Sequence, residues 1–166
     1  MNDPAQITSP APNAIPTAQF SIGITTFRPL GGVFPITAKI GLTPGAEPDF
    51  PVTVDGTNIT LEPPAGISVK LVMRCLQPTY LLLGIAFASD TAISAVGQTT
   101  FPNINVRHIL SDAGVPLGSE LTITDHPMVP EGEEQVFDYI ILVQDVASGE
   151  IGIIDPEIRN RPGPPP

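Results

Sequence analysis

The stretch Ile67-Ser-Val-Lys-Leu-Val-Met-Arg-Cys-Leu76 decides the fold class. Apolar side chains recur at every second position from 67 to 75, while Ser68, Lys70 and Arg74 alternate with them. This two-residue period is typical of a β-strand that buries one of its faces. We therefore expect a half-buried strand here.

A second apolar run, Tyr80–Ala88, follows a break at Gln77-Pro78-Thr79. Pro78 has no backbone N–H, so it cannot donate a hydrogen bond to a sheet and should end the first strand. The second run is apolar on both faces, which favours a strand that is covered on both sides. We interpret the two runs as the central hairpin of a β-sandwich.

Alternating or short apolar segments between turn residues continue along the chain. They predict strands at 18–25, 33–40, 50–54, 58–61, 92–96, 104–110, 121–124, 135–144 and 150–154, with a tight turn at Asp55-Gly56. Helical spacing of apolar residues is absent and prolines interrupt most windows, so we expect very little helix. About nine to eleven short strands predict an all-β fold, and we expect an immunoglobulin-like antiparallel β-sandwich.

The chain has 166 residues, of which 42% are hydrophobic, enough for one ordinary domain. Such a domain buries roughly two thirds of the surface of the unfolded chain. Four prolines among small and polar residues predict an extended arm over residues 1–17. We assign the sandwich domain to residues 18–160 and a proline-rich tail to residues 161–166.

The acidic composition restricts the possible partners. A net charge of −10 with only seven lysines and arginines would repel a phosphate backbone, so we expect no nucleic-acid partner. The single cysteine, Cys75, lies on the apolar face of its strand, where we expect a small buried hydrophobic residue and no disulfide.

The hydrophobic pattern also bears on localisation. The first residues contain no basic region followed by an apolar one, and the longest apolar run is about half of what crosses a bilayer. We therefore expect no signal peptide, no membrane contact and a cytoplasmic location.

The closing segment Asp155-Pro-Glu-Ile-Arg-Asn-Arg-Pro162 carries the pattern Asp-Pro-x-Ile-x-Asn-x-Pro. This resembles the end of the small bacterial DP-EP family. Pro63-Pro64-Ala65-Gly66 and Gly84-Ile85-Ala86-Phe87 are similar to the middle of that family. The resemblance spans about residues 52–162 and implies a β-sandwich; the family has no established activity, so it implies no catalytic residues.

The physical chemistry of this motif predicts an anchor. Pro156 fixes its own φ and favours an extended Asp155, and the side chains of Asp155 and Asn160 can each accept a bond from a nearby backbone amide. We expect a strand that leaves the sheet and is pinned to the body, with Ile158 filling a gap at the edge.

Metal and cofactor sites are not indicated. His108, His126 and Cys75 are the only soft metal ligands, and their spacing does not match a zinc site. Gly31-Gly32 precedes no predicted helix, so it is not a phosphate-binding loop. We therefore predict no metal and no cofactor.

Asp125-His126 and the acidic turn Glu131-Gly132-Glu133-Glu134 are the remaining candidates for chemistry. The simpler interpretation is an exposed loop and a solvated turn. The alternative is a small-ligand-binding module or a hydrolase with a loop-end site around Asp125 and His126, which requires His126 to lie close to Asp155 or Glu133 in a concave pocket.

The sequence favours a different hypothesis about function over this loop-end site. In this hypothesis the chain is a non-enzymatic structural or interaction module with no catalytic residues, and it forms a homo-oligomer, for which the N-terminal arm offers one route of association.

Overall fold

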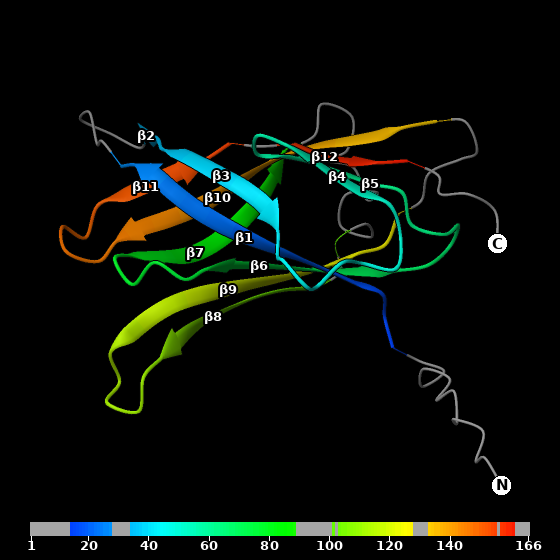
Figure 1. Cartoon of the computed structure of the whole chain (residues 1–166). Coiled ribbons are helices and arrows are strands. Elements are labelled where there is room, and N and C mark those ends of the chain that lie inside the picture. Colours follow the sequence, from blue (N-terminus) through cyan, green and yellow to red (C-terminus); the bar gives the residue numbers. More distant parts are fainter. Residues whose placement is uncertain are drawn as a thin grey trace, which may run out of the picture.

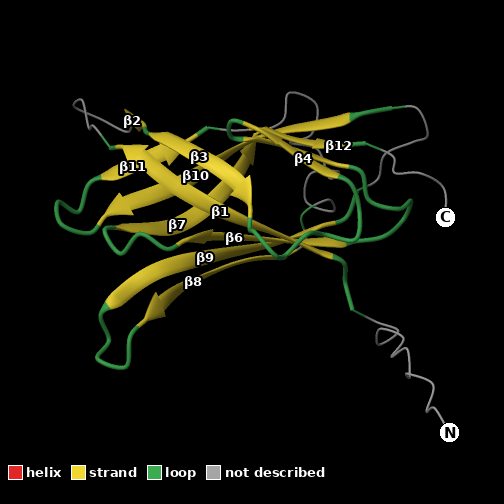
Figure 2. Ribbon diagram, viewed as in Figure 1, coloured by secondary structure: helices red, strands yellow, loops and turns green. Residues whose placement is uncertain are grey.

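The computed structural model describes residues 14–27, 34–88, 101, 103–127, 133–155 and 157–161. These residues form two β-sheets and contain no helix (Figures 1 and 2). The all-β prediction is confirmed, and the two sheets enclose a shared hydrophobic core.

The five-stranded sheet has β6 at its centre. Its spatial order is β3 (Thr37–Leu42), β1 (Thr17–Thr26), β6 (Val69–Cys75), β9 (Pro116–Asp125) and β8 (Asn103–Leu110). β1 and β6 run parallel, and the other neighbours run antiparallel.

The seven-stranded sheet is organised around the long strand β10 (Gln135–Asp145). One side of β10 pairs with β7 (Tyr80–Ala88), and its other side pairs with β11 (Ile151–Ile154) and then β12 (Glu157–Asn160). The short strand β2 (Phe34–Pro35) extends the sheet beyond β11, while β5 (Asn58–Leu61) and β4 (Val52–Asp55) extend it beyond β12. β2 runs parallel to its neighbour β11, and β5 runs parallel to its neighbour β12. Because β1 and β6 are also parallel, both sheets are mixed, whereas purely antiparallel sheets were expected.

The core lies between the two layers and is built from alternate residues of the long strands. Its largest fully buried side chains are Phe20, Leu71, Met73, Leu121 and Ile123 of one sheet, and Ile59, Leu61, Leu82, Phe137, Tyr139, Ile141 and Ile154 of the other. Each side chain of this size contributes about 1.5–3 kcal/mol when it is removed from water. A buried hydrogen bond of 2.7 Å from the Leu82 amide to Ser119 Oγ joins β7 to β9 across the layers.

The predicted central hairpin is wrong, because β6 and β7 belong to different sheets. The chain turns a corner at Gln77-Pro78-Thr79 and crosses from one layer to the other. Beyond the end of β6, the side chain of Gln77 replaces a strand residue: its Oε1 accepts a bond of 2.6 Å from the Ile24 amide, and its Nε2 donates one of 3.0 Å to the Ile24 carbonyl. β7 is also not covered on both faces, since Ala86 is exposed.

A similar change of sheet divides the predicted strand 33–40. Residues 34–35 form β2 in one sheet and residues 37–42 form β3 in the other, with the buried Ile36 between them. The hairpin predicted at Asp55-Gly56 forms with its turn one residue later: Asp55 pairs with Asn58, so the turn residues are Gly56 and Thr57, and Gly56 has a left-handed φ of 64°. The strand expected at 92–96 lies outside the described residues.

The closing motif differs from the expected edge plug. β12 is an interior strand between β10 and β5, and Ile158 is fully buried in the core. The motif therefore joins the β4–β5 hairpin to the rest of the sheet. At the other end of the domain, β1 begins at Thr17, and the Pro16 carbonyl already accepts a 2.8 Å bond from the Lys70 amide.

Candidate functional site

The outer face of the five-stranded sheet concentrates positive charge in an acidic protein. Strand alternation and the pairing register place four of the seven lysines and arginines on this face: Lys39, Lys70, Arg74 and Arg107. The only acidic side chain among the strand residues of the same face is Glu120. The face therefore has a formal charge of 4 − 1 = +3, against −10 for the whole chain.

Three of these charges form a row across neighbouring strands. Arg74 of β6 and Arg107 of β8 lie directly opposite Glu120 of β9, one on each side. Arg74 Nε is 2.6 Å from Glu120 Oε2, and Arg107 Nε is 2.9 Å from Glu120 Oε1. Arg74 Nη1 also donates a 3.2 Å hydrogen bond to Gln19 Oε1 on β1. The carboxylate thus lies between two guanidinium groups and binds one with each of its oxygens.

Burial distinguishes the anchor from the groups that it positions. The Glu120 side chain is 9% exposed, whereas those of Arg74 and Arg107 are 38% and 63% exposed. Burial alone would raise the pKa of Glu120, but the hydrogen bonds and charges of the two arginines outweigh it and hold this pKa below its usual value. Glu120 is therefore a buried, ionised anchor, and the arginines face solvent.

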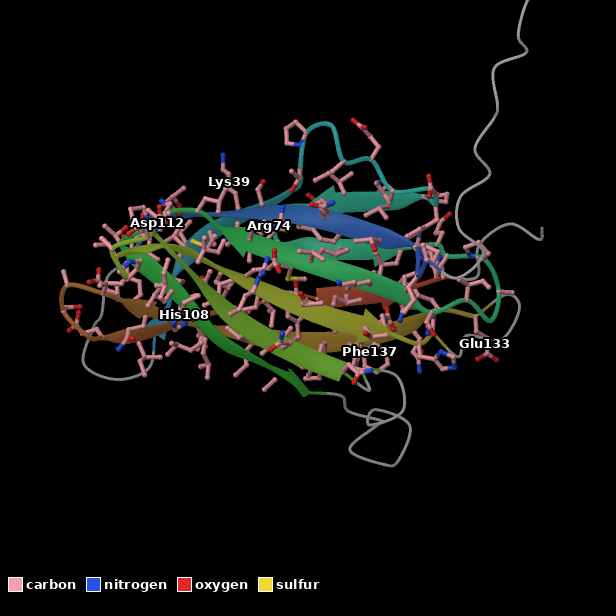
Figure 3. All side chains as sticks on the ribbon, turned by 90° about the horizontal axis from the view of Figure 1, so that it is seen from below. Lys39, Arg74, His108, Asp112, Glu133 and Phe137 are labelled. Atoms are coloured by element: carbon pink, nitrogen blue, oxygen red, sulfur yellow. The ribbon has the colours of Figure 1, made fainter. Side chains whose placement is uncertain are left out.

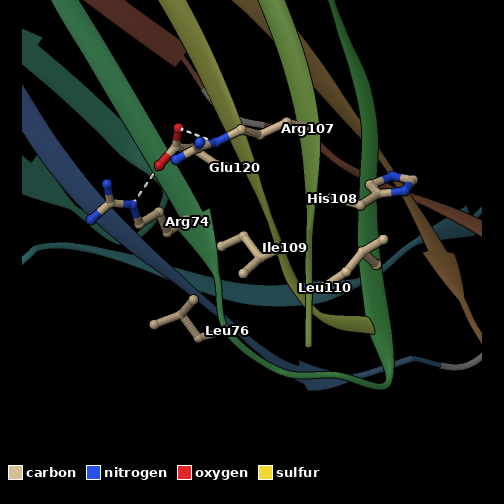
Figure 4. A pocket seen from close by; sticks show the side chains of 7 residues that line it. All are labelled: Arg74, Leu76, Arg107, His108, Ile109, Leu110 and Glu120. Carbon is tan, nitrogen blue, oxygen red and sulfur yellow. Dashed lines mark hydrogen bonds and ion pairs between the residues drawn. The ribbon is translucent and has the colours of Figure 1, made fainter. Parts of the chain in front are cut away.

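A hollow of about 420 Å³ adjoins this row at the end of β8 (Figure 4). Its lining residues are Arg74, Leu76, Arg107, His108, Ile109, Leu110 and Glu120. Figure 4 shows Arg107 and Ile109 on one side of β8 and His108 and Leu110 on the other, as strand alternation requires. Figure 3 shows Lys39, Arg74 and His108 on the whole molecule. The hollow therefore combines two cations with several apolar side chains.

This site was not predicted from the sequence. Arg74 was expected only as an outward residue of its strand, and Arg107 only as a residue of the strand predicted at 104–110. Their convergence on Glu120 depends on the register between three strands that are distant in sequence, and a single sequence does not specify that register. The detectable signal was the placement of most cations on alternating positions of predicted strands.

The residues of the alternative site, Asp125 and His126, point in different directions. Asp125 faces the core, is fully buried, and accepts a 3.3 Å hydrogen bond from Asn160 Nδ2. Burial raises the pKa of Asp125 to about 7 despite that bond. His126 is exposed, and its Nδ1 lies 2.6 Å from Ser68 Oγ. The two neighbours therefore do not form an acid–base pair with each other.

The acidic groups expected beside His126 have other neighbours. Glu134 forms ion pairs of 3.2 Å with Arg159 and 2.9 Å with Arg161. Glu133 and Asp155 are exposed, and within the described ranges no hydrogen bond or ion pair joins either of them to His126. Glu131 and Gly132 lie outside the described residues. The described contacts thus do not assemble the loop-end site.

The two histidines lie far apart in the sheet, and Cys75 is separated from His108 by Ser119 of the strand between them. His108 pairs with Ser119 near the start of β9, whereas His126 follows its last residue. Cys75 is fully buried, and burial raises its pKa. Among the residues that the structure describes, no three His, Cys, Asp or Glu side chains form a group that could hold a metal ion. No helix in the described part of the chain is long and apolar enough to cross a membrane.

Comparisons with known proteins give no match. No protein-family model and no curated protein matches this chain. The resemblance to the DP-EP family stays a prediction, and the function has to be argued from the surfaces of the sandwich.

Proposed function

We propose that this chain is a non-enzymatic interaction module that forms a homo-oligomer in the cytoplasm, built as an immunoglobulin-like β-sandwich of the DP-EP type. The observation that supports it best is a group of exposed and half-buried apolar side chains on the outer face of the seven-stranded sheet. Large exposed apolar patches on soluble proteins mark contact surfaces.

The register of three neighbouring strands defines this apolar outer patch. Core-facing residues alternate with outward ones along β10, β7 and β11. The outward apolar residues are Ala86 of β7, Val136, Ile140 and Leu142 of β10, and Ile151 and Ile153 of β11. Val136 and Ile151 are 42% and 41% exposed. The patch therefore extends over adjacent strands of one sheet.

A second copy of the chain is the partner that fits this patch. A sheet face can pack against an identical face related by a two-fold axis, because such a contact is self-complementary. The margin of the patch has both signs of charge, since Asp138 and Arg159 are outward neighbours of Val136 on β10 and β12. Arg159 is already paired with Glu134 and Glu157 of its own chain, so the apolar centre of the patch, and not its charged margin, has to supply the association.

The experiment is a measurement of mass by light scattering over a range of protein concentrations. We expect the full chain to be larger than a monomer and Ile151→Lys to shift it toward the monomer. Ile67→Lys is the matched control, because Ile67 is an isoleucine of the same exposure, 41%, and lies outside the patch. A monomeric full chain, or an equal response of both variants, would contradict the proposal.

A deletion of residues 1–13 tests the other route to association, through the arm. The deletion keeps Pro16, whose carbonyl accepts the bond from Lys70, and keeps all of β1. If this deletion lowers the number of chains per particle and Ile151→Lys does not, the oligomer forms through the arm and not through the apolar outer patch.

A further inference from the structure

The arginine row offers hydrogen-bond donors that its internal contacts do not use. Each guanidinium has five N–H donors. Glu120 accepts only the Nε–H of each arginine, and Gln19 accepts from Arg74 Nη1. Among the described residues, Arg107 Nη1 and Nη2 and Arg74 Nη2 have no hydrogen-bond acceptor. These nitrogens belong to side chains that are partly exposed at the hollow.

The charges at the hollow favour a monoanion. Two arginines and one ionised glutamate give a local charge of 2 − 1 = +1. A carboxylate matches both this charge and the planar fork of a guanidinium, with which it forms two parallel hydrogen bonds. A doubly charged phosphate would instead place excess negative charge beside Glu120.

The rest of the lining favours an apolar body on the same ligand. Leu76 and Ile109 line the hollow beside the arginines, whereas Leu110 lies on the other side of β8, and Leu76 is 64% exposed. A volume of about 420 Å³ is within the range of small-molecule sites, which are typically lined by apolar groups with a few polar ones that fix the orientation.

We propose that the hollow between β6, β8 and β9 binds a small monocarboxylate with an apolar chain, with Arg74 and Arg107 on the carboxylate and Leu76 and Ile109 on the hydrocarbon. Glu120 is a positioning residue, because its ion pairs hold the side chains of Arg74 and Arg107 at the hollow. The site goes beyond the proposed self-association and does not depend on it, because it lies on the outer face of the other sheet.

Octanoate is the probe, and binding is measured by calorimetry and by the amide shifts of β8 and β9 in two-dimensional NMR. We expect saturable binding of octanoate, weaker binding of acetate, which lacks the apolar chain, and weaker binding of octanol, which lacks the charge. Added salt should weaken the binding of octanoate.

The variants separate this site from general binding of anions or detergents. Arg107→Gln should weaken octanoate binding by about tenfold or more, because a hydrogen bond to a charged group is worth roughly 1.5–3 kcal/mol. Lys39→Gln removes one positive charge from the same sheet face, outside the hollow, and should leave the affinity unchanged. Arg107 is largely exposed, so its variant should fold, and its NMR spectrum verifies this.

Three results would overturn the proposal. These are the absence of octanoate binding to the folded wild-type chain at millimolar concentration, equal affinity of octanoate and octanol, and equal weakening by Arg107→Gln and Lys39→Gln. None of them bears on self-association, since they concern the other sheet.

Discussion

Asn160 Nδ2 donates a 3.3 Å hydrogen bond to Asp125 Oδ1 inside the core and thereby joins β12 of one sheet to the end of β9 in the other. Both residues are fully buried. The second oxygen of Asp125 and the amide oxygen of Asn160 are also buried and have no hydrogen-bond partner among the described residues. Both of these atoms are acceptors when Asp125 is ionised, so a proton on Asp125 supplies the donor that the pair lacks.

The pair predicts a stability that falls as the pH rises. Burial raises the pKa of Asp125 from 3.8 to about 7, so the folded state holds a proton that the unfolded state releases. The proton on Asp125 contributes its full stabilisation below about pH 4, and this stabilisation is lost between pH 4 and 7. Above pH 7 the free energy of unfolding no longer depends on Asp125 protonation. About three pKa units correspond to a loss on the order of 4 kcal/mol. Urea unfolding at pH 5 and pH 8 covers about two of these three units, so the measured loss should be on the order of 3 kcal/mol.

Asp125→Asn is the control for this prediction. An asparagine cannot ionise and its amide can donate to the Asn160 oxygen, so the variant should be more stable than wild type at pH 8 and should lose much of the dependence between pH 5 and 8. If the wild-type and variant curves stay parallel over this range, Asp125 does not titrate as proposed.

The side chain of Gln77 should be important for stability although it lies at the corner between two strands. Its amide exchanges two hydrogen bonds with the backbone of Ile24. Gln77→Ala would leave both backbone groups without their partner, which costs roughly 1–3 kcal/mol when they are shielded from water. Gln144→Ala is the matched control, because that amide makes one exposed bond of 3.4 Å and should change the free energy of unfolding little. Urea unfolding of both variants tests the difference.

The corner also shows what the sequence can and cannot predict. Alternation identified β1, β6, β8 and β10 because burial of one face produces a local period of two. It could not show that β6 and β7 occupy different sheets, because a turn of the same length at Gln77-Pro78-Thr79 is compatible with either path. Both the hydrogen bonds of Gln77 and the convergence of Arg74 and Arg107 on Glu120 are set by pairing between distant segments.

The closing motif shows the same limit for polar residues. Asn160 was expected to bond a nearby backbone amide, which is the usual local role of its side chain. In the structure its partner is Asp125, which is 35 residues away in sequence. Asp125 itself was considered for chemistry with His126, its neighbour in the chain. The burial of Asp125 was not predicted, because the predicted strand 121–124 ended one residue before it. In the structure β9 continues to Asp125.

Gly118 should not tolerate a side chain. It lies where β9 passes the end of β6, and a Cβ atom there would overlap the Cys75 carbonyl oxygen and lie 3.0 Å from the Leu76 Cα. Because these are backbone atoms, relief requires movement of a strand, and we expect Gly118→Ala to cost about 1–3 kcal/mol or more. Gly84→Ala on β7 is the control, since a Cβ there meets no atom within 4 Å. Similar unfolding midpoints for the two variants would contradict this.

The thiol of Cys75 should react only when the chain opens. It is fully buried on β6, and burial raises its pKa, so the nucleophilic thiolate is both scarce and inaccessible. We expect the aromatic disulfide reagent DTNB to react with the native chain on the order of a hundredfold or more slowly than with the urea-unfolded chain. Ser148→Cys places a second thiol in the exposed turn after β10 and should react at once, which shows that the reagent is active. Equally fast labelling of Cys75 in the native chain would mean that β6 is not held between β1 and β9, and the five-stranded sheet would then lack its central strand.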